Sequence, residues 1–234
     1  MARIGIKRVG VITGLVAEAE ILESFPAEVR PAFAAAGASA VRAEAAALGL
    51  LDRGCAAILS FGVAGGLDPA LAAGTIVIAD SVVGWDGRRH PTDPAWREAA
   101  RRALQDSGPV AVGAIFGADA PLITRDAKKE CAARTGAVAV DMESHGAVRS
   151  AVGKGAPFLA IRAVADDASR TIPAWVMDAI LPDGGLAPDV ILRALLPKPW
   201  MVWGLLGLAR DQARAVKALR RVVARLGPGL GLAL

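Results

Sequence analysis

The sequence predicts one α/β domain with three layers, in which helices cover both faces of a central mixed, mostly parallel sheet. Short apolar runs bounded by glycine alternate with longer stretches rich in alanine and leucine, which is typical of strands that alternate with helices. Several of these runs are apolar throughout, as expected for strands that are buried on both faces. The length of 234 residues suits a single large core of this kind.

Apolar, β-branched runs mark the expected strands, and alanine- and leucine-rich stretches mark the expected helices. The strands are expected at about 9–13, 57–61, 75–79, 110–116, 137–140 and 157–164. The helices are expected at about 17–24, 39–53, 94–106, 125–135, 142–153 and 210–226. The chain shows no internal repeat.

The segment at about 182–209 interrupts the regular alternation. It holds four prolines and the pair Gly184-Gly185, which favour an irregular connection. Because too little chain follows to build a second core, we expect an apolar excursion from a single domain that spans residues 1–234. The closing segment, at about 210–226, is expected to form a basic amphipathic helix.

The composition excludes two classes of protein. Hydrophobic residues make up 54% of the chain and charged residues 21%, with a mean hydropathy of +0.43, which excludes a disordered chain. No uninterrupted apolar run reaches the roughly 18 to 20 residues that cross a bilayer. The N-terminus shows no secretion signal, and Cys55 and Cys131 match no metal spacing, so we expect reduced thiols in a cytoplasmic protein.

The net charge of +4 is concentrated in the C-terminal region. Residues 182–234 carry eight basic and three acidic side chains, which leaves 19 basic and 20 acidic ones in the residues before them. The body of the domain is therefore nearly neutral. This balance argues against nucleic acid as a partner.

The first of three segments that carry chemistry is 59–67. It delivers Gly62, Gly65 and Gly66 where the chain leaves a predicted strand. Glycines at this point let the backbone approach a ligand closely at the carboxyl edge of the sheet. Alone, the segment is also typical of an ordinary turn.

The second segment, 139–145, places Asp141, Met142 and Glu143 between an apolar strand and a helix. Side chains at such a junction point outward, and nearby amide hydrogens stabilise a carboxylate. An ordinary acidic start of a helix, with Asp141 as its cap, is the competing interpretation.

The third segment, 159–167, is a strongly apolar strand with Arg162 inside it and two acids, Asp166 and Asp167, at its end. A charge within such a strand needs a partner, because an unpaired buried charge is costly. The segment therefore predicts either a structural ion pair or a binding site.

Together and in this order, the three segments resemble the nucleoside phosphorylase/nucleosidase superfamily, whose pattern is G-x-A-G-G, then D/E-M-E, then R-x-x-x-D. The chain is most similar to its methylthioadenosine/S-adenosylhomocysteine nucleosidases and, more narrowly, to the hopanoid-associated phosphorylases. The resemblance covers about residues 9–173. It implies an enzyme that cleaves the N-glycosidic bond of an adenine nucleoside, needs no metal or other cofactor, and assembles as a homo-oligomer.

The resemblance also implies roles for individual residues. Glu143 is similar to the glutamate that holds the ribose 2′- and 3′-hydroxyls, and Met142 resembles the methionine beneath the sugar. Asp166 matches the aspartate that interacts with purine N7 and the exocyclic amine. Glu18 takes the place of the glutamate that activates water, with Glu20 as the alternative if the register differs.

Glu18 and Asp166 are thus the expected catalytic pair. Asp166 would supply a proton to the leaving base and Glu18 would take one from water, and each such transfer is typically worth about 10² to 10⁴ in rate. Further contacts with the substrate are expected within the motifs and in the stretch that flanks the base. These residues are Gly62, Ala64, Gly65, Leu122 and Arg162.

Either water or inorganic phosphate could serve as the nucleophile. A phosphorylase needs a phosphate site, for which arginine forks and backbone amides are suited. The loop at 13–18 contains no arginine, and Val63 stands where similar enzymes offer a hydroxyl. These residues favour water, although Arg42, Arg88 or Arg89 could still reach the site and make phosphate a co-substrate.

The C-terminal region favours a large apolar group on the substrate. The apolar excursion suits an interface, and the closing helix has apolar residues at helical spacing between basic ones, which suits a membrane surface. These apolar residues are Ala213, Val216, Leu219, Val223 and Leu226. With the resemblance to hopanoid-associated enzymes, this predicts a lipid-linked nucleoside, adenosylhopane, cleaved to ribosylhopane and adenine.

Several alternatives stay open. The closing helix could pack on the sheet, with the apolar excursion at a subunit contact. The activity could be that of a phosphate-dependent purine nucleoside phosphorylase or a methylthioadenosine/S-adenosylhomocysteine nucleosidase. A non-catalytic nucleoside-binding protein would not need Glu18, and a peripheral protein of the inner membrane would leave nucleosides intact.

Overall fold

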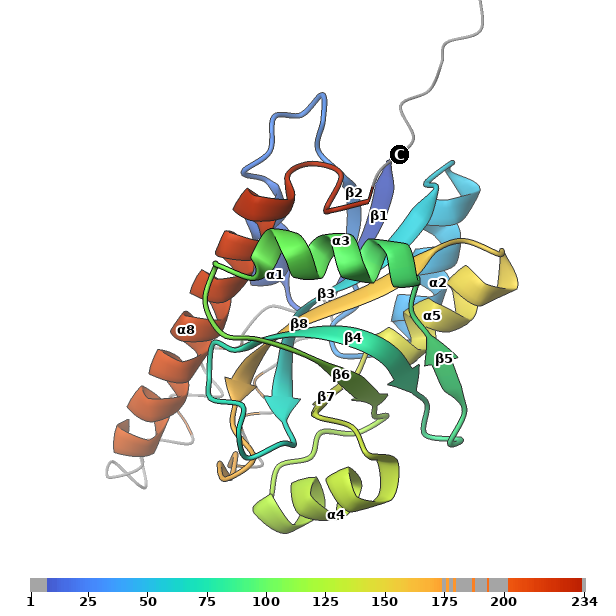
Figure 1. Cartoon of the computed structure of the whole chain (residues 1–234). Helices are drawn as coiled ribbons and strands as arrows, with labels where there is room; N and C mark the ends of the chain where they lie inside the picture. Colours follow the sequence, from blue (N-terminus) through green and yellow to red (C-terminus); the bar gives the residue numbers. More distant parts are fainter. Residues whose placement is uncertain are drawn as a thin grey trace, which may run out of the picture.

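The computed structural model describes residues 8–173, 176, 179, 187, 193 and 202–232. Helices cover both faces of a central sheet (Figure 1), which confirms the predicted three-layer α/β/α class. Most of the apolar excursion predicted at about 182–209 lies outside the described residues.

The described strands agree with the six predicted ones and add two short strands. They are β1 (Val9–Thr13), β2 (Ala32–Ala35), β3 (Ala57–Gly66), β4 (Ile76–Val83), β5 (Arg89–Pro91), β6 (Val110–Gly117), β7 (Ala139–Asp141) and β8 (Phe158–Asp166). The two additions, β2 and β5, end the strand order on either side. Strand β2 is rich in alanine and β5 is short and contains a proline, so neither has the composition of a typical strand.

Six helices in the described part of the chain surround the sheet. They are α1 (Val16–Leu22), α2 (Ala40–Asp52), α3 (Pro94–Leu104), α4 (Arg125–Thr135), α5 (Ser144–Gly153) and α8 (Val202–Leu226). Three of them begin at a side chain that accepts a backbone N–H bond, namely Ser39 before α2, Asp93 before α3 and Thr124 before α4. Such caps satisfy amides that a helix leaves unpaired at its N-terminus.

The sheet is more closed than the sequence predicts. Its strand order is β2-β1-β3-β7-β6-β4-β5, and β8 pairs with both β3 and β4. The strands β3, β8, β4, β6 and β7 therefore form a ring. Five of the eight pairings are parallel, which confirms a mixed, mostly parallel sheet.

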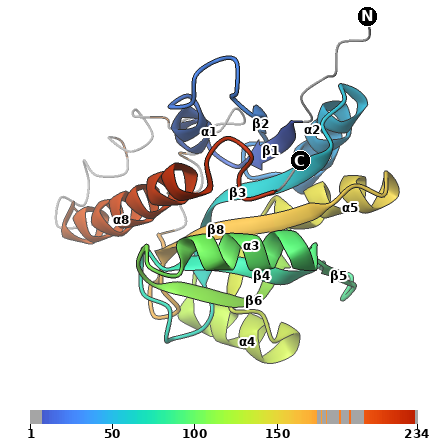
Figure 2. The same cartoon turned by 45° about the horizontal axis from the view of Figure 1, so that its top comes forward.

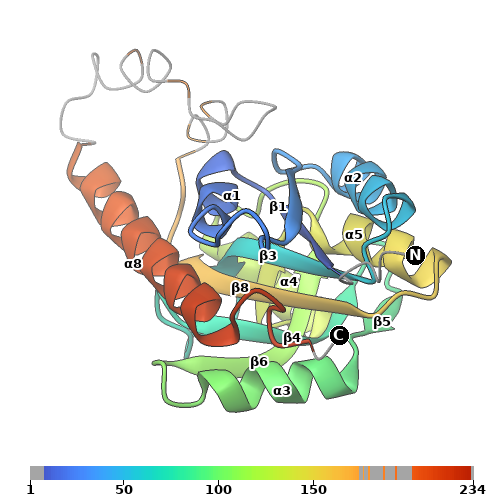
Figure 3. The ribbon, with the colours of Figure 1, turned by 90° about the horizontal axis from the view of Figure 1, so that it is seen from above.

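Two helical layers bury the two faces of the sheet. On one face, α1, α3 and α8 pack on residues such as Leu59 and Ile161. On the other, α2 and α5 pack on residues such as Ile58 and Ala160, so successive strand residues alternate between faces. Figures 2 and 3 show α3 and α5 on opposite sides of β8 and β4. Helix α4 covers the ends of β6 and β7 through a third, smaller cluster.

Helix α8 begins eight residues before the predicted start at 210. Its apolar face belongs to the core, because Leu219, Val223 and Leu226 are buried against the sheet. The interpretation of this face as a membrane-binding surface is therefore wrong. Of the other two residues in the predicted stripe, Val216 is half-buried and Ala213 is exposed. The competing interpretation, a closing helix packed on the sheet, describes this region.

Candidate functional site

Arg162 lies at the centre of a buried cluster of polar side chains. Its side chain is 0% exposed and its Nε donates a 2.7 Å hydrogen bond to Asp141 Oδ2. Its Nη2 donates to Ser60 Oγ at 2.6 Å and to Ser144 Oγ at 3.2 Å, and lies 3.3 Å from Glu143 Oε2. The prediction that this arginine requires a partner within its apolar strand is confirmed.

Glu18 belongs to the same cluster and is held by the backbone. It is 1% exposed at the start of α1, where its Oε2 accepts hydrogen bonds of 2.9 Å from the amides of Gly14 and Leu15. Its Oε1 accepts a 2.8 Å bond from the amide of Val63 at the exit of β3. The carboxyl group is thus fixed between two segments that are far apart in the sequence. Glu20, the alternative residue, is exposed.

Two glycines make room for the carboxyl groups of the cluster. A Cβ atom at Gly62 would lie 2.5 Å from Glu18 Oε2 and 2.6 Å from Arg162 Nη1. A Cβ atom at Gly14 would lie 2.7 Å from Glu143 Oε1. All three distances are shorter than side chains tolerate, so a larger residue at either position would displace these charged groups. Glu18, Glu143 and Arg162 therefore form one compact group beside the middle of β3.

This group contains more acid than base. Asp141, Glu143 and Glu18 surround the single guanidinium of Arg162. Burial raises the pKa of Glu143 to about 8 against the attraction of Arg162, and the charges of Asp141 and Glu18 contribute to the rise. Burial also raises the pKa of Glu18, opposed by Arg162 and by the backbone amides. Since one cation does not balance three buried carboxylates, the cluster retains a proton at neutral pH.

A second charged group lies further along the same sheet edge. Lys128 of α4 is 0% exposed, and its ammonium donates a hydrogen bond to Asp166 Oδ2 at the end of β8. It also donates to the carbonyl oxygens of Asp167 at 2.8 Å and Arg170 at 3.2 Å. Sequence reasoning missed this lysine, although it shares a face of α4 with the buried Cys131, three residues on.

A bulge aims Asp166 at Gly65, which lies with Gly62 and Gly66 inside β3 and not, as predicted, in a turn after the strand. Strand β8 follows β3 in register as far as Val164 opposite Ala64, after which Asp166 instead of Ala165 pairs with Gly65. Bulges of this kind redirect a side chain and often lie beside active sites. A Cβ atom at Gly65 would lie 3.3 Å from Asp166 Oδ2. Burial raises the pKa of Asp166 to about 6, against the attraction of Lys128.

The predicted site residues thus fall into two groups along β3. Glu18, Gly62, Glu143 and Arg162 form the first, and Gly65 with Asp166 forms the second. Gly62 and Gly65 are three residues apart in β3, so their Cα atoms are separated by about 10 Å along the strand. Three other predicted residues lie outside both groups. Ala64 is buried, whereas Leu122 and Met142 are half-buried.

The three arginines considered for phosphate have other partners. Arg42 Nε donates to the carbonyl oxygen of Ala36 at 2.6 Å. Arg88 forms an exposed ion pair with Asp86, and Arg89 donates to Ser81 Oγ at 2.8 Å. These contacts keep Arg88 and Arg89 at the β4–β5 hairpin.

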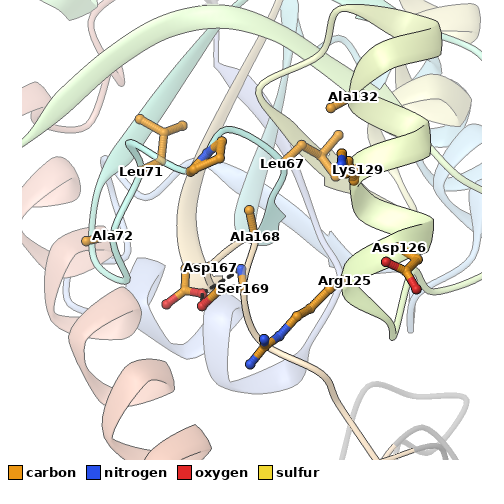
Figure 4. A pocket seen from close by; sticks show the side chains of 11 residues that line it. Leu67, Leu71, Ala72, Arg125, Asp126, Lys129, Ala132, Asp167, Ala168 and Ser169 are labelled. Atoms are coloured by element: carbon orange, nitrogen blue, oxygen red, sulfur yellow. Dashed lines mark hydrogen bonds between the residues drawn. The ribbon is translucent and has the colours of Figure 1, made fainter.

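A cavity of about 460 Å³ lies beside the second group. Figure 4 shows that its walls come from the segment after β3, from α4 and from the residues after β8, including Leu71, Arg125 and Asp167. Neither Glu18 nor Asp166 lines it. That these carboxyl groups share a pocket with the glycines of β3 therefore stays a prediction.

The described part of the chain contains neither a membrane-spanning helix nor a metal-binding group. None of its helices is long and apolar enough to cross a membrane. Within the same residues, no group of three or more His, Cys, Asp or Glu side chains could hold a metal ion. Cys131 is buried, Cys55 is half-buried, and neither is in a disulfide.

The chain matches the phosphorylase superfamily over residues 27–180, which is more than half of its length. It therefore belongs to this superfamily and is an enzyme. The matched range contains the three motifs but begins after Glu18. Among curated proteins the sequence has no match.

Solved structures agree with this assignment at the level of the fold. The 5′-methylthioadenosine/S-adenosylhomocysteine nucleosidase of Neisseria meningitidis, bound to methylthio-immucillin-A, is 21% identical with a TM-score of 0.68, over 93% of this chain and 99% of that chain. The S-adenosylhomocysteine nucleosidase of Streptococcus pyogenes is 18% identical with a TM-score of 0.68, over 97% of this chain and 100% of that chain. Futalosine hydrolase of Helicobacter pylori is 16% identical with a TM-score of 0.69, over 94% and 98%.

Proposed function

We propose that the chain hydrolyses the N-glycosidic bond of an adenine nucleoside, with Glu18 and Asp166 as its catalytic residues. The observation that carries this proposal is the carboxyl group of Glu18, which three backbone amides fix beside Arg162 and Glu143. A second carboxyl group, Asp166, lies beside Gly65, three residues further along β3 than Gly62. Two acids at this spacing suit a ligand whose sugar and base are held separately.

The proposed reaction needs one proton transfer at each end of the substrate. Glu18 takes a proton from water as the water oxygen bonds to the anomeric carbon. The bond from this carbon to the base breaks, its electron pair stays with the base, and protonated Asp166 donates a proton to purine N7. The products are adenine and a free ribosyl sugar, and both carboxyl groups return to their starting states by exchange with solvent.

Glu143 has a different proposed task. Its pKa of about 8 lets it hold a proton at neutral pH, and the backbone amides of Gly14, Leu15 and Val63 favour the ionised form of Glu18, which is the form that acts as a base. In its protonated state the Glu143 carboxyl group can hydrogen-bond the ribose hydroxyls beside Gly14. Hydrogen bonds to charged groups contribute roughly 1.5 to 3 kcal/mol each, and those between neutral groups about 1 kcal/mol.

Water is favoured over phosphate by the positions of the basic side chains. Arg88 and Arg89 bind at the β4–β5 hairpin, and the Arg42 guanidinium binds carbonyl oxygens after β2. Arg162 is already surrounded by carboxylates, which repel an anion. A purine nucleoside phosphorylase would need a cationic site that these contacts do not provide.

The choice of an adenine nucleoside rests on the motifs and on the solved structures. The similar enzyme from Neisseria meningitidis is named a 5′-methylthioadenosine/S-adenosylhomocysteine nucleosidase, and the one from Streptococcus pyogenes an S-adenosylhomocysteine nucleosidase. The same fold also serves futalosine hydrolase, so the fold alone does not select the 5′ group. A nucleosidase of this kind requires no cofactor.

Adenine release from 5′-methylthioadenosine without phosphate tests the proposal. Glu18→Gln is expected to lower kcat by about 10² to 10⁴. Glu20→Gln is the matched control, because Glu20 lies on the same helix but is exposed, and it should keep full activity. If the wild-type protein releases no adenine from this or any other adenine nucleoside, or if both variants are equally active, the proposal fails.

For the natural substrate we propose a lipid-linked nucleoside such as adenosylhopane, cleaved by a homo-oligomer in peripheral contact with the inner membrane. Support comes from the sequence resemblance, from the apolar composition of 182–209 and from the exposed basic side chains of α8. These include Arg210, Arg214, Lys217, Arg220 and Arg225. They can attract an anionic surface even though the apolar face of α8 is buried.

Turnover and binding test this finer proposal together. Adenosylhopane in detergent is expected to give a higher kcat/KM than 5′-methylthioadenosine, and the protein should sediment with anionic but not with neutral vesicles. Light scattering should give the mass of an oligomer, larger than the 23.9 kDa of one chain. Equal kcat/KM for the two substrates, with no vesicle binding, would remove the lipid link while leaving hydrolysis intact.

A further inference from the structure

We propose that Lys128 is a positioning residue for the cleavage reaction, which fixes the Asp166 side chain at the end of β8 and sets the charge on its carboxyl group. This inference rests on the proposed function of Asp166. It concerns a residue of α4 that neither the motifs nor the superfamily assignment identifies.

The ammonium group of Lys128 is fully engaged. It has three N–H donors, and three acceptors surround it: Asp166 Oδ2 and the carbonyl oxygens of Asp167 and Arg170. All three acceptors belong to the end of β8 or to the residues that follow. A lysine is almost never fully buried without such partners, so this side chain has one defined position.

The position of Lys128 determines which oxygen of Asp166 can meet a ligand. The lysine binds Oδ2, so Oδ1 is the oxygen that remains for purine N7. The bulge before Asp166 brings the same side chain against Gly65 of β3. Lysine and bulge therefore act on one side chain from two directions, which restricts it to a single orientation.

Lys128 is also the main positive charge that faces Asp166. The other charged groups are Asp167 and Arg170, from the segment after β8, and Lys128 is the one from α4. Burial raises the pKa of Asp166 to about 6, the charge and hydrogen bond of Lys128 lower it, Asp167 raises it and Arg170 lowers it. Without the lysine charge, Arg170 still opposes the effect of burial, whereas Asp167 adds to it.

This arrangement predicts a change in the pH profile. Protonated Asp166 donates to the base, so kcat/KM of the free enzyme should fall as the pH rises through about 6. In Lys128→Met the carboxyl group keeps its proton to higher pH, and the falling limb should move upward by about one pH unit or more. A lysine that only stabilised the fold would lower activity at every pH and leave the limb in place.

Three variants and one direct titration form the experiment. Lys128→Met removes the charge, Lys128→Arg retains it, and Lys129→Met removes an exposed charge from the next position of α4. The limb should move in Lys128→Met, stay near its wild-type position in Lys128→Arg and not move in Lys129→Met. In an Asp166→Asn background, Lys128→Met should leave the residual profile unchanged.

Carboxyl ¹³C NMR of Asp166 separates this inference from the proposed function, because it requires no activity. The wild-type carboxyl group should titrate near pH 6, with the Lys128 Nζ resonance responding at the same midpoint, and the midpoint should rise in Lys128→Met. If Lys128→Met does not fold, the wild-type protein still tests the inference, because its Asp166 carboxyl and Lys128 Nζ resonances should change at the same pH midpoint. The inference is wrong if the two resonances change at different midpoints, or if the falling limb of the pH profile does not move in a folded and active Lys128→Met variant. Either result overturns it even where adenine release is confirmed.

Discussion

Two charged groups lie along the same strand and differ in their balance of acid and base. Around Gly62, three carboxyl groups share one guanidinium, that of Arg162. Near Gly65, one carboxyl group faces one ammonium, that of Lys128. Burial raises a carboxyl pKa in both places, to about 8 for Glu143 and to about 6 for Asp166. The first group therefore keeps a proton at neutral pH, whereas the charge of the second depends on a single partner.

This difference matches the two halves of the proposed reaction. The sugar end needs one ionised carboxylate to activate water, and Arg162 and three backbone amides favour that form of Glu18 against the effect of burial. The base end needs a proton donor, and Asp166 can carry its proton only while the pH is near or below its pKa. Loss of Arg162 should thus disrupt the first group far more than loss of Lys128 disrupts the second.

The largest effect on stability is expected for Arg162→Met. The substitution leaves buried carboxylates without their cation, which costs about 3 to 5 kcal/mol in the free energy of unfolding. Urea denaturation at neutral pH measures this cost. A loss below about 1 kcal/mol would show that the carboxyl groups rearrange or take up protons at little expense, and the two groups would then be alike.

Lys128→Met should cost less than Arg162→Met, and its cost should depend on pH. At pH 5 most of the Asp166 carboxyl groups carry a proton and no longer need the ammonium charge, so the loss of stability should be small. Toward pH 8 the wild-type protein gains the ion pair that the variant lacks, and the loss should grow. Denaturation of both proteins at the two pH values measures the change, and a loss that is independent of pH would contradict it.

The pH dependence of stability should separate the two groups. A carboxyl group whose folded pKa is raised binds its proton more tightly in the native state, so its contribution is complete below the unfolded pKa and declines as the pH rises through the folded pKa. For Asp166 the decline should fall between 3.8 and about 6, and for Glu143 between 4.5 and about 8. Asp166→Asn should flatten the first window and Glu143→Gln the second. If both variants flatten the same pH window, the assignment of the two windows to Asp166 and Glu143 is wrong.

The smallest effect is expected for an exposed pair outside both groups. Arg149 and Glu44 join α5 to α2 at 2.6 Å, with side chains that are 42% and 43% exposed. Solvent screens such a pair, so Arg149→Ala should cost less than about 1 kcal/mol and leave adenine release unchanged. This variant is the baseline against which the loss in Arg162→Met is judged.

Local pattern was enough to predict most of the fold and the need of Arg162 for a partner, whereas the roles of Glu18, Glu143 and Asp166 came from the family resemblance. The six predicted strands and the partner required by Arg162 follow from apolar runs and from the cost of an unpaired buried charge. Closure of the sheet was not predictable in this way, because β8 pairs with both β3 and β4 over long distances in the sequence. Such pairings leave no periodic signal.

The missed Lys128 and the wrong interpretation of the apolar stripe on α8 have the same physical origin. Lys128 and Lys129 are adjacent in a polar helix, and only tertiary packing decides that the first points inward. The stripe on α8 has the same spacing whether it faces a sheet or a membrane, since amphipathicity records that a face is buried but not what covers it. In the structure, the core covers Leu219 and Val223.

The identity of the sugar product tests the central claim most directly. The wild-type protein is incubated with 5′-methylthioadenosine or adenosylhopane, with and without inorganic phosphate, and both products are identified by mass. Hydrolysis by the Glu18 and Asp166 groups predicts adenine and a free ribosyl sugar in equal amounts, at a rate that phosphate does not change. Adenine release only in the presence of phosphate, with a ribosyl 1-phosphate as the second product, would contradict it.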